Sequence, residues 1–220
     1  MNKSIFREYD IRGIFQKELN ESTVKKIAYY FAKEVIKTVP NAKYISVGYD
    51  ARTHSEQLCE WLISGINKAG LEVLTVGLVA TPVNYFSNFI GFEEKKTSAS
   101  IMITGSHNPP KYNGFKITID KQPFFGDDIY ALGDNVIKSD LIIADNDMST
   151  FINAKEQYIN YMIDNFSHLK LNDKKFIFDC WNGAAGSVLR EILDGLNINH
   201  KIIFETPDGT FPNHHPDPSD

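Results

Sequence analysis

The segment around Ser106 carries the side chains best suited to chemistry in this chain. Residues 99–103 form a mostly apolar, β-like run, and Ser106 follows in a short segment that ends at Pro109 and Pro110. Proline fixes φ and lacks an N–H donor, so regular structure cannot continue through this point. A hydroxyl on a stiff loop beside His107 suits a nucleophile or a phosphate carrier. An ordinary turn between two strands is the alternative.

A Ser–His nucleophile pair is the weaker form of this hypothesis. Neighbouring side chains on an extended chain point to opposite sides, and no Gly-x-Ser-x-Gly elbow surrounds Ser106. We therefore disfavour a serine hydrolase. His107 is better suited to donate a hydrogen bond to an anion beside Ser106, and a hydrogen bond to the loop backbone is an equal alternative.

Lys116 is a second candidate. It begins an alternating run, 115–119, directly after the turn-forming pair Asn113-Gly114. If that strand returns beside the serine loop, Lys116 faces Ser106, where a lysine could hold negative charge or carry a proton. A solvated strand lysine is the alternative.

Arginines occur in two further segments. Residues 6–13 place Arg7 and Arg12 among acidic residues, and Arg52 follows a strand-like run together with Asp50. A guanidinium group binds phosphate through two parallel hydrogen bonds. A surface ion-pair cluster is the alternative for the first segment, and an Asp50–Arg52 pair that fixes the loop is the favoured interpretation of the second.

Composition and charge limit the class of protein. The chain has 220 residues, of which 42% are hydrophobic and 23% charged, and its formal net charge is -5 at pH 7. This acidic balance argues against nucleic acid as a partner. No run approaches the ~18 apolar residues of a membrane helix, and no apolar signal segment follows Met1. Cys59 and Cys180 fit free, packed thiols in a reducing compartment, so we expect a cytoplasmic protein without a membrane partner.

Hydrophobic periodicity predicts an α/β fold. Helices are expected over 22–36, 55–69, 81–89 and 127–137, and strands over 43–49, 71–76, 97–103 and 115–119, with Ser55 as an N-cap and Gly70 as a helix stop. This alternation predicts a mixed, mostly parallel sheet flanked by helices. Ligands of such folds bind beyond the carboxyl ends of strands, where Ser106 is expected.

A polar segment at 138–153 is the predicted linker to a second unit. Beyond it we expect helices near 158–166 and 185–193 and strands at 174–178 and 200–204. These are too few elements to cover both faces of a sheet. We therefore predict one domain over 1–145 and a partial second α/β domain over 150–220.

Two segments of the second unit are candidate sites. Residues 182–186 could present backbone N–H groups to an anion, although tight strand-to-helix packing is favoured. His214, His215 and Asp217 do not match a zinc spacing, and a connector is favoured over a metal site.

Several of these segments, in this order, resemble the α-D-phosphohexomutase family and its bacterial phosphomannomutase/phosphoglucomutase branch. The matching segments are FREYDIRG at 6–13, VGYDAR at 47–52, ATPVNY at 80–85, TGSHNPPKYNGFKI at 104–117, DCWNGAAG at 179–186 and GTFPNHHPDP at 209–218. The serine-loop match is the most specific. Trp181 departs from the glycine usual in the fifth segment.

The resemblance implies an isomerase that interconverts hexose 1-phosphate and hexose 6-phosphate, of mannose, glucose or both, through hexose 1,6-bisphosphate. Ser106 would carry the phosphoryl group. His107, Lys116 and Arg12 match positions that contact the phosphoserine or assist proton transfer. Tyr9 and Asn108 match residues that line the same site.

The resemblance also implies a cofactor and a longer protein. Mg²⁺ would bind the phosphate on Ser106 and three aspartates of a DGDGDR-type loop, a motif that does not occur in these 220 residues. We therefore expect the N-terminal portion of a four-domain enzyme, inactive alone and partnered by its C-terminal domains. A non-catalytic phosphate-binding or regulatory module is the alternative.

Overall fold

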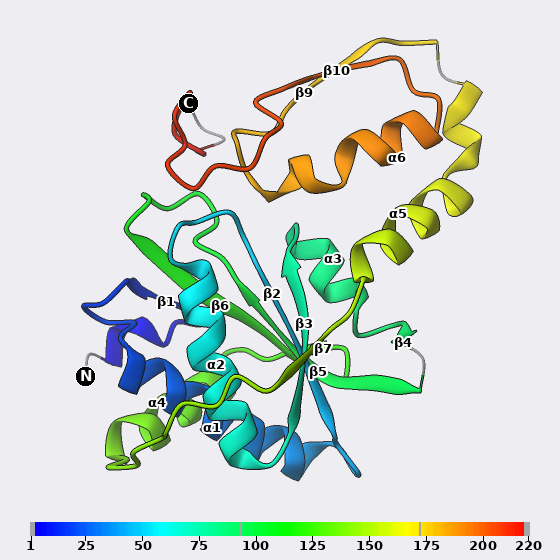
Figure 1. The fold of residues 1–220 in the computed structure, drawn as a ribbon. Helices are drawn as coiled ribbons and strands as arrows, with labels where there is room; N and C mark the ends of the chain where they lie inside the picture. Colours follow the sequence, from blue (N-terminus) through cyan, green and yellow to red (C-terminus); the bar gives the residue numbers. More distant parts are fainter. Residues whose placement is uncertain (1–2, 93, 172, 218–220) are drawn as a thin grey trace.

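An eight-stranded mixed sheet forms the centre of the larger of two α/β units (Figure 1). The computed structural model describes residues 3–92, 94–171 and 173–217. The main strands are Ile11–Ile14 (β1), Tyr44–Tyr49 (β2), Glu72–Leu78 (β3), Lys95–Ile103 (β5), Tyr112–Ile119 (β6) and Ser149–Phe151 (β8), and the short strands Gly91–Phe92 (β4) and Gln122–Pro123 (β7) pair with β5 and β6. Their order is β1-β6-β5-β2-β3-β8. The pairs within β5-β2-β3-β8 are parallel, whereas β6 is antiparallel to both β5 and β1, which confirms the predicted fold class.

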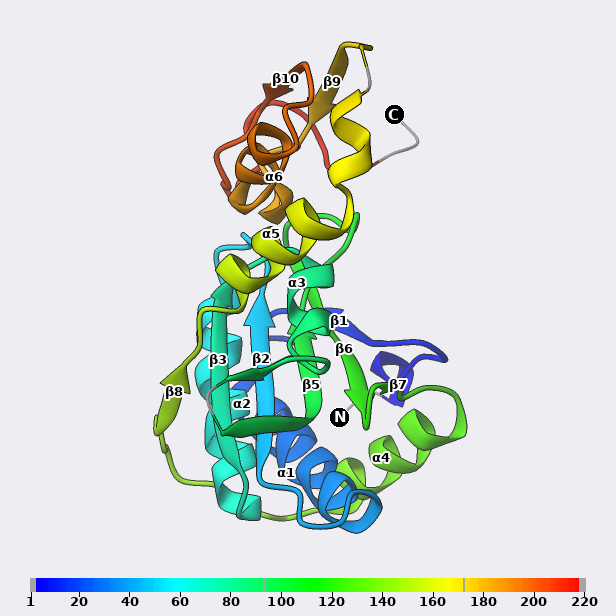
Figure 2. The ribbon, with the colours of Figure 1, turned by 90° about the vertical axis from the view of Figure 1, so that its right-hand side faces the viewer.

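Helices cover both faces of this sheet (Figure 2). One face carries Glu21–Thr38 (α1), Ser55–Ala69 (α2) and Asp127–Lys138 (α4), and the other carries Thr81–Phe86 (α3) beside Ala154–Asn165 (α5). None of the helices in the described part of the chain is long and apolar enough to cross a membrane.

The sequence of α1 shows why a helix forms there. The Asn20 side chain accepts a hydrogen bond from the Thr23 N–H at 3.1 Å and caps the first turn. Val24, Ile27 and Phe31 recur at helical spacing, and all three are fully buried. This apolar stripe directs α1 toward α2 and the sheet.

Helices α1 and α2 approach each other closely at Gly65. A Cβ atom at this position would lie 2.2 Å from the Lys25 carbonyl oxygen and 2.6 Å from the Ala28 Cβ. The close contact between the helices requires a residue without a Cβ atom at position 65, because the backbone of α1 cannot move away without disrupting that helix.

The start of α2 differs from the predicted one. The N-cap is His54 and Ser55 is the first helical residue, so the prediction of Ser55 as the cap is wrong by one position. The Ser55 hydroxyl donates instead to Asp50 Oδ1 at 2.7 Å. The hydroxyl is used by this contact with Asp50 and does not cap the first turn of α2. Gly70 ends the helix as predicted, with a φ of 100°.

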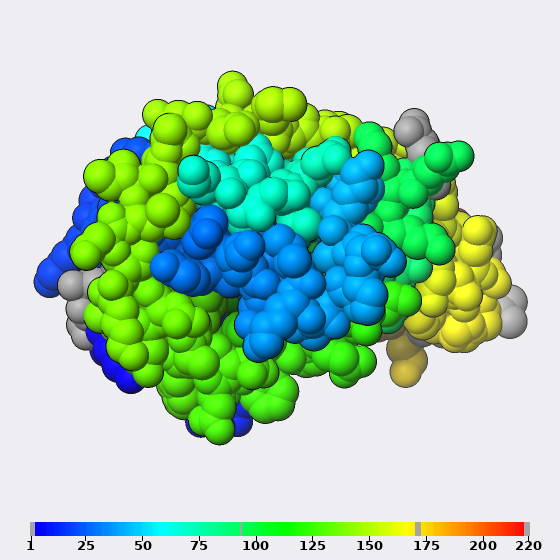
Figure 3. Space-filling model, turned by 90° about the horizontal axis from the view of Figure 1, so that it is seen from below, coloured from blue at the N-terminus to red at the C-terminus, as the bar shows by residue number. Residues whose placement is uncertain are grey.

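The segment between α4 and β8 runs along the outer edge of α2 (Figure 3). The buried ammonium group of Lys25 in α1 holds it there, through hydrogen bonds to the Ile143 carbonyl at 3.3 Å and to the Asp145 carboxylate at 2.5 Å. Part of the predicted linker is built into the sheet, because β8 pairs in parallel with β3.

A smaller α/β unit follows α5. Its sheet consists of the parallel strands Phe176–Asp179 (β9) and His200–Ile203 (β10), and Leu189–Gly195 (α6) packs against α5. The predicted helix over 185–193 is divided, since Ala184–Ser187 form a 3-10 helix before α6. Ile192 of α6 and the flanking residues Val188 and Leu196 join buried side chains of β3 and α3 in one apolar cluster, which attaches the smaller unit to the larger one.

We predict that Gly65→Ala lowers the free energy of unfolding by about 1–3 kcal/mol, the usual cost of an overpacked core. Helix propensity alone would favour alanine by about 1 kcal/mol. The sign of the change in the free energy of unfolding therefore tests the close contact between the two helices. Urea unfolding measures the effect. Lys68→Ala, on the exposed side of α2, is the matched control and should change stability little. Stabilisation by Gly65→Ala would contradict the packing described here.

Candidate active site

A cavity of about 420 Å³ opens where the carboxyl ends of β2 and β5 face the smaller unit. Both units line it. The larger unit contributes Asp50, Ala51, Ala80, Thr81, Met102, Thr104, Ser106 and His107, and the smaller one contributes Cys180, Trp181, Gly183, Ala184, Ala185, Phe211 and Pro216. The site thus lies at the sheet edge predicted from the strand order.

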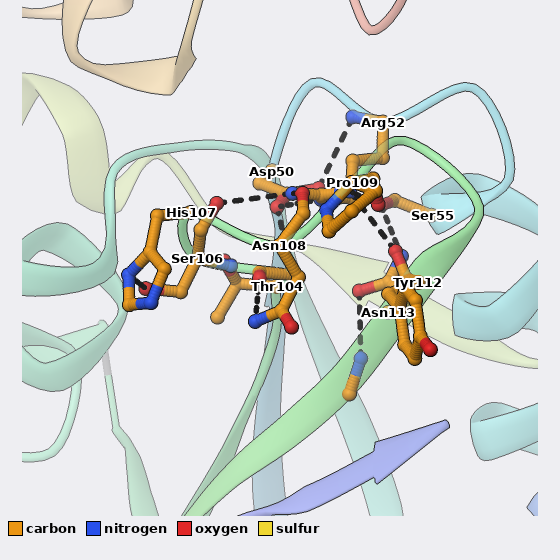
Figure 4. A network of polar contacts seen from close by, with 12 residues as sticks. Asp50, Arg52, Ser55, Thr104, Ser106, His107, Asn108, Pro109, Tyr112 and Asn113 are labelled. Atoms are coloured by element: carbon orange, nitrogen blue, oxygen red, sulfur yellow. Dashed lines mark hydrogen bonds and ion pairs between the residues drawn. The ribbon is translucent and has the colours of Figure 1, made fainter. Parts of the chain in front are cut away.

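The Ser106 loop is a tight turn that leaves its hydroxyl exposed (Figure 4). Ser106 has a φ of 51°, in the left-handed region that few non-glycine residues adopt. Its N–H donates to Thr104 Oγ1 at 2.9 Å. The Asn108 N–H and the Asn108 side-chain amide both donate to the Gly105 carbonyl, at 3.0 and 3.1 Å. These hydrogen bonds fix the turn on both sides of the serine.

Arg52 fixes the backbone of the Ser106 loop through hydrogen bonds. Its guanidinium donates to four backbone carbonyl groups: Ser106 at 3.0 Å, Asn108 at 2.6 Å, Pro109 at 2.8 Å and Tyr112 at 3.0 Å. The side chain is completely buried. One cation therefore satisfies the carbonyl groups of a loop that has no regular backbone pairing.

Asp50 connects this cation to the sheet. Its carboxylate lies 3.3 Å from Arg52 Nε and accepts the Gly105 N–H at 3.0 Å. It also accepts the Ser55 hydroxyl, which in turn accepts the Asn113 side-chain amide at 2.9 Å. The favoured interpretation of Asp50 and Arg52 as a pair that fixes the loop agrees with these contacts.

Gly105 is required by the close approach of Arg52. A Cβ atom at Gly105 would lie 2.0 Å from Arg52 Nε. Burial lowers the pKa of the Arg52 guanidinium, the Asp50 carboxylate opposes this, and Arg12 lowers it further. An arginine stays protonated under such a shift, so the loop rests on a permanent buried charge.

Arg12 reaches the same loop from β1. Its side chain is 4% exposed, forms an ion pair with Asp10 and donates to the Gly105 carbonyl. The structure thus places Arg12 against the residue before Ser106. Its contact is with the backbone of the loop.

Lys116 lies on the same face of the sheet as a cavity-lining residue, and it is not itself among the described residues that line the cavity. In the antiparallel pair of β5 and β6 it stands opposite Met102, which lines the cavity. Opposite residues of an antiparallel pair project from the same face, and Lys116 is half-buried there. The predicted return of this strand beside the serine loop is observed.

His107 and Tyr9 have different surroundings. His107 is exposed, lines the cavity, and has its Nδ1 3.4 Å from Ser106 Oγ. That separation exceeds the about 2.6–3.2 Å of an activated nucleophile and base. Tyr9 is 73% exposed and stacks on Phe125 with ring centroids 6.4 Å apart. It is not among the described residues that line the cavity.

The contribution of the smaller unit to this cavity was not predicted from the sequence. Phe211 lies with its ring 5.4 Å from the Arg52 guanidinium carbon, and Trp181 is part of the cavity wall. Both residues occur in segments that carry the family resemblance. Only the position of the second unit reveals that they face the serine loop.

Both cysteines are buried free thiols. Burial raises the pKa of Cys59 to about 12 and also raises the pKa of Cys180, to which Glu205 and Asp179 contribute. Neither thiol is activated as a nucleophile, as expected of packing residues.

The segment containing His214 packs against the end of β9. His214 Nε2 lies 3.0 Å from Asp179 Oδ2, at the end of β9. Within residues 3–92, 94–171 and 173–217, no group of three or more His, Cys, Asp or Glu side chains is placed to hold a metal ion.

The fold and the cavity define an α/β protein that presents a serine hydroxyl beyond the carboxyl end of a strand. The family model described as phosphoglucomutase/phosphomannomutase, alpha/beta/alpha domain I, matches residues 3–135, and the corresponding model of domain II matches residues 156–220. The chain belongs to the phosphoglucomutase/phosphomannomutase family, which confirms the resemblance.

Curated relatives and a solved structure agree with this assignment. A phosphomannomutase/phosphoglucomutase from Pseudomonas syringae pv. tomato is 35% identical over 98% of this chain and 44% of its own length. A phosphoglucomutase from Neisseria meningitidis serogroup A is 35% identical over 99% of this chain and 46% of its own length. The crystal structure of a family protein from Burkholderia thailandensis superposes with a TM-score of 0.89 at 31% identity, over 100% of this chain and 48% of that one. The chain thus spans about half the length of these relatives.

We predict that Arg52→Lys lowers the free energy of unfolding by about 2–4 kcal/mol, because a lysine cannot replace the four hydrogen bonds and hydrogen bonds to charged groups contribute about 1.5–3 kcal/mol each. Amide hydrogen exchange across 104–112 should accelerate. Chemical unfolding and exchange mass spectrometry measure the two effects. Arg190→Lys, at an exposed ion pair with Glu205, should leave both nearly unchanged. Equal behaviour of the two variants would show that Arg52 does not fix the loop.

Proposed function

We propose that Ser106 carries a phosphoryl group and that the enzyme interconverts hexose 1-phosphate and hexose 6-phosphate, of mannose, glucose or both. The observation that carries this proposal is the exposed Ser106 hydroxyl on a loop tied to buried Arg52, at the wall of a cavity of about 420 Å³. Family membership and the names of the relatives from Pseudomonas syringae and Neisseria meningitidis support the same reaction.

In the proposed reaction, phosphorylated Ser106 gives its phosphoryl group to a free sugar hydroxyl. The bond between phosphorus and Ser106 Oγ breaks and a bond between phosphorus and the sugar oxygen forms. The sugar hydroxyl passes its proton to a base, and Ser106 Oγ takes up a proton as it leaves, which restores the serine hydroxyl. The product is hexose 1,6-bisphosphate. After the bisphosphate turns over, its other phosphoryl group returns to Ser106 Oγ and the isomerised sugar phosphate is released.

The side chains around the loop suit these steps. Phosphoryl transfer is promoted chiefly by positioning and by positive charge around the transferring oxygens. We assign Lys116, on the same face of the sheet as Met102, to charge stabilisation or proton transfer, and His107 to a hydrogen bond with the phosphate. Arg12 adds positive charge while it holds the Gly105 carbonyl.

Tyr9 and Asn108 are the proposed binding residues. Asn108 belongs to the fixed turn of the serine loop, so its position relative to the phosphate is constant. Tyr9 is exposed on the larger unit, where its phenol is accessible to a ligand.

Mg²⁺ is the proposed cofactor, bound through the phosphate on Ser106. It would neutralise phosphate charge when bound. The described residues supply no complete set of metal ligands by themselves, so the proposal requires ligands from elsewhere in the protein. The roles given to Lys116, Arg12 and His107 do not depend on the ion.

Hexose phosphates and hexose 1,6-bisphosphate are the proposed ligands, in a cytoplasmic enzyme. We further propose that residues 1–145 form the domain with the phosphoserine loop and residues 150–220 part of a second domain, whose partners are further C-terminal domains of the same protein. The two sheets and the two family matches support this division. Residues 1–220 alone are then not expected to isomerise sugar phosphates.

Ser106→Ala tests the proposal in the complete protein that contains this chain. The variant should lose covalently bound phosphate and lose turnover by about 10⁴-fold or more, because the group that accepts the phosphoryl is gone. Mass spectrometry of the peptide containing residue 106 and a coupled assay with glucose 1-phosphate measure these effects.

The matched control is Ser149→Ala, an exposed serine of β8 far from the loop in sequence, which should retain phosphate and activity. Wild-type protein that never acquires phosphate on Ser106 and never turns over a hexose phosphate would contradict the proposal. It would favour the phosphate-binding or regulatory module. Labelling of Ser106 by a fluorophosphonate would favour a hydrolase.

Lys116→Met should lower kcat by about 10²–10³-fold and leave KM within about twofold, because the ammonium group acts on charge that develops in the transition state. Steady-state kinetics with glucose 1-phosphate separate the two constants. Lys201→Met, an exposed lysine of β10, should behave as wild type. An effect of Lys116→Met on KM alone would remove Lys116 from the chemical step.

A further inference from the structure

His54 is a buried titratable residue that the proposed reaction does not use. It follows Arg52 by two positions, is the N-cap residue of α2 and is 9% exposed. Its side chain makes no capping hydrogen bond to α2, although capping is the usual use of a polar side chain at this position. The other contacts of the imidazole therefore determine what it does.

An aromatic stack covers one side of the imidazole. The Phe15 ring stacks on His54 with centroids 4.5 Å apart and 14° between the planes, and Trp61 stacks on Phe15 at 5.9 Å. His54 Nε2 is buried and has no hydrogen-bond partner among the residues that the structure describes. A proton on this nitrogen would be a donor without an acceptor, and an unpaired buried polar group is costly. These surroundings suit a neutral imidazole.

The end of the serine loop meets the polar side of the same ring. A hydrogen bond to the Tyr112 backbone raises the pKa of His54, which is the effect of an acceptor, here the carbonyl group. The Arg52 guanidinium donates to this carbonyl at 3.0 Å. His54 and Arg52 therefore hold the same backbone group, at the point where the loop enters β6.

Two positive charges oppose protonation of His54. One is the buried guanidinium of Arg52, and the other is the partial charge at the N-terminus of α2, a helix of 15 residues. Burial is the main cause that lowers the pKa of His54. The Tyr112 hydrogen bond raises it, Arg52 lowers it and Asp50 raises it, so the pKa stays below its ordinary value.

Further charged side chains on the segments around His54 have contacts of their own. They are Glu18 with the Ile14 N–H at 2.9 Å, Glu56 with the Tyr49 hydroxyl at 3.3 Å and Lys111 with the Tyr112 ring at 5.8 Å. The charged groups that act on the imidazole are Arg52 and Asp50. Asp50 also compensates Arg52, so it cannot offset a second cation fully.

We infer that the neutral imidazole of His54 helps to hold the serine loop closed and that its protonation opens the loop. Protonation puts a second cation beside Arg52, and opening relieves this by giving the imidazole access to water. His54 is then a positioning residue that makes the order of the loop depend on pH. This inference concerns the loop alone and does not rest on the proposed function. The alternative is that His54 only fills space in the aromatic stack.

The direction of the pH dependence follows from the lowered pKa. In an open loop the imidazole titrates near its ordinary pKa of about 6.5, whereas in the closed loop its pKa is lower. The open form binds more protons, so the closed loop loses stability as the pH falls through about 6.5. At pH 5.5 the largest effect on the opening equilibrium is about 10-fold, because this pH is one unit below the ordinary pKa.

Hydrogen exchange mass spectrometry tests the inference in the complete protein that contains this chain. It measures the protection of backbone amides over 104–112 at pH 7.5 and 5.5, corrected for the intrinsic effect of pH on exchange. Protection should fall by about 3- to 10-fold more in wild type than in His54→Gln, which keeps a hydrogen-bonding side chain but cannot be protonated. His168→Gln, at an exposed histidine, is the matched control and should behave as wild type.

Nuclear magnetic resonance of protein with isotope-labelled histidine gives a second readout. The imidazole signal that is absent from His54→Gln should titrate with a pKa below the ordinary value of about 6.5. If His54→Gln does not fold, as judged by circular dichroism, His54→Phe replaces it in both experiments, because phenylalanine keeps a ring against Phe15.

The outcomes separate this inference from the proposed function. An equal loss of protection in wild type and the non-titrating variant, or an imidazole that titrates at or above its ordinary pKa, overturns the inference. Phosphate on Ser106 in the same protein would then leave the proposed function standing. A loss of protection confined to wild type and His168→Gln supports the inference, even if Ser106 never acquires phosphate.

Discussion

The buried guanidinium of Arg52 is the interaction on which the rest of the site depends. A loop that leaves its strand abruptly cannot pair its carbonyl groups in a ladder, and unpaired polar groups away from water are costly. Arg52 satisfies four of them at once, and Asp50 compensates its charge. The requirement extends to Gly105, whose lack of a side chain leaves room for the cation. The buried charge of Arg52 thus fixes the loop backbone and with it the position of the Ser106 hydroxyl.

The second constraint is the arrangement of the two α/β units. The larger unit alone presents Ser106 at an open sheet edge, and the smaller unit turns this edge into a cavity with walls on both sides. Phe211 lies against the same guanidinium that holds the serine loop. The Arg52 guanidinium therefore contacts both the serine loop and Phe211 of the smaller unit. Ser106, Arg52 and Trp181 belong to one physical system, although they come from distant parts of the sequence.

The sequence predicted the parts of this system that depend on local patterns. Helical and alternating periodicities identified the main helices and strands, and the alternation at 115–119 falls within strand β6. Strands β1 and β8 were missed, because Ile11–Ile14 contains an arginine and a glycine and both strands exist only through pairing with distant strands. Ser55 was misassigned as a cap because its hydroxyl is used by Asp50. The presence of Trp181 and Ser106 in the lining of one cavity has no local signal in the sequence.

The attachment of β8 to β3 has a mechanical consequence. The Phe151 end of β8 and the Ala154 start of α5 are separated by Ile152 and Asn153 alone. The Ile152 N–H is also bonded to the Thr75 carbonyl at 2.9 Å. A connection this short fixes the start of α5 at the end of β8, so the placement of α5 beside α3 follows from the pairing of β8 with β3.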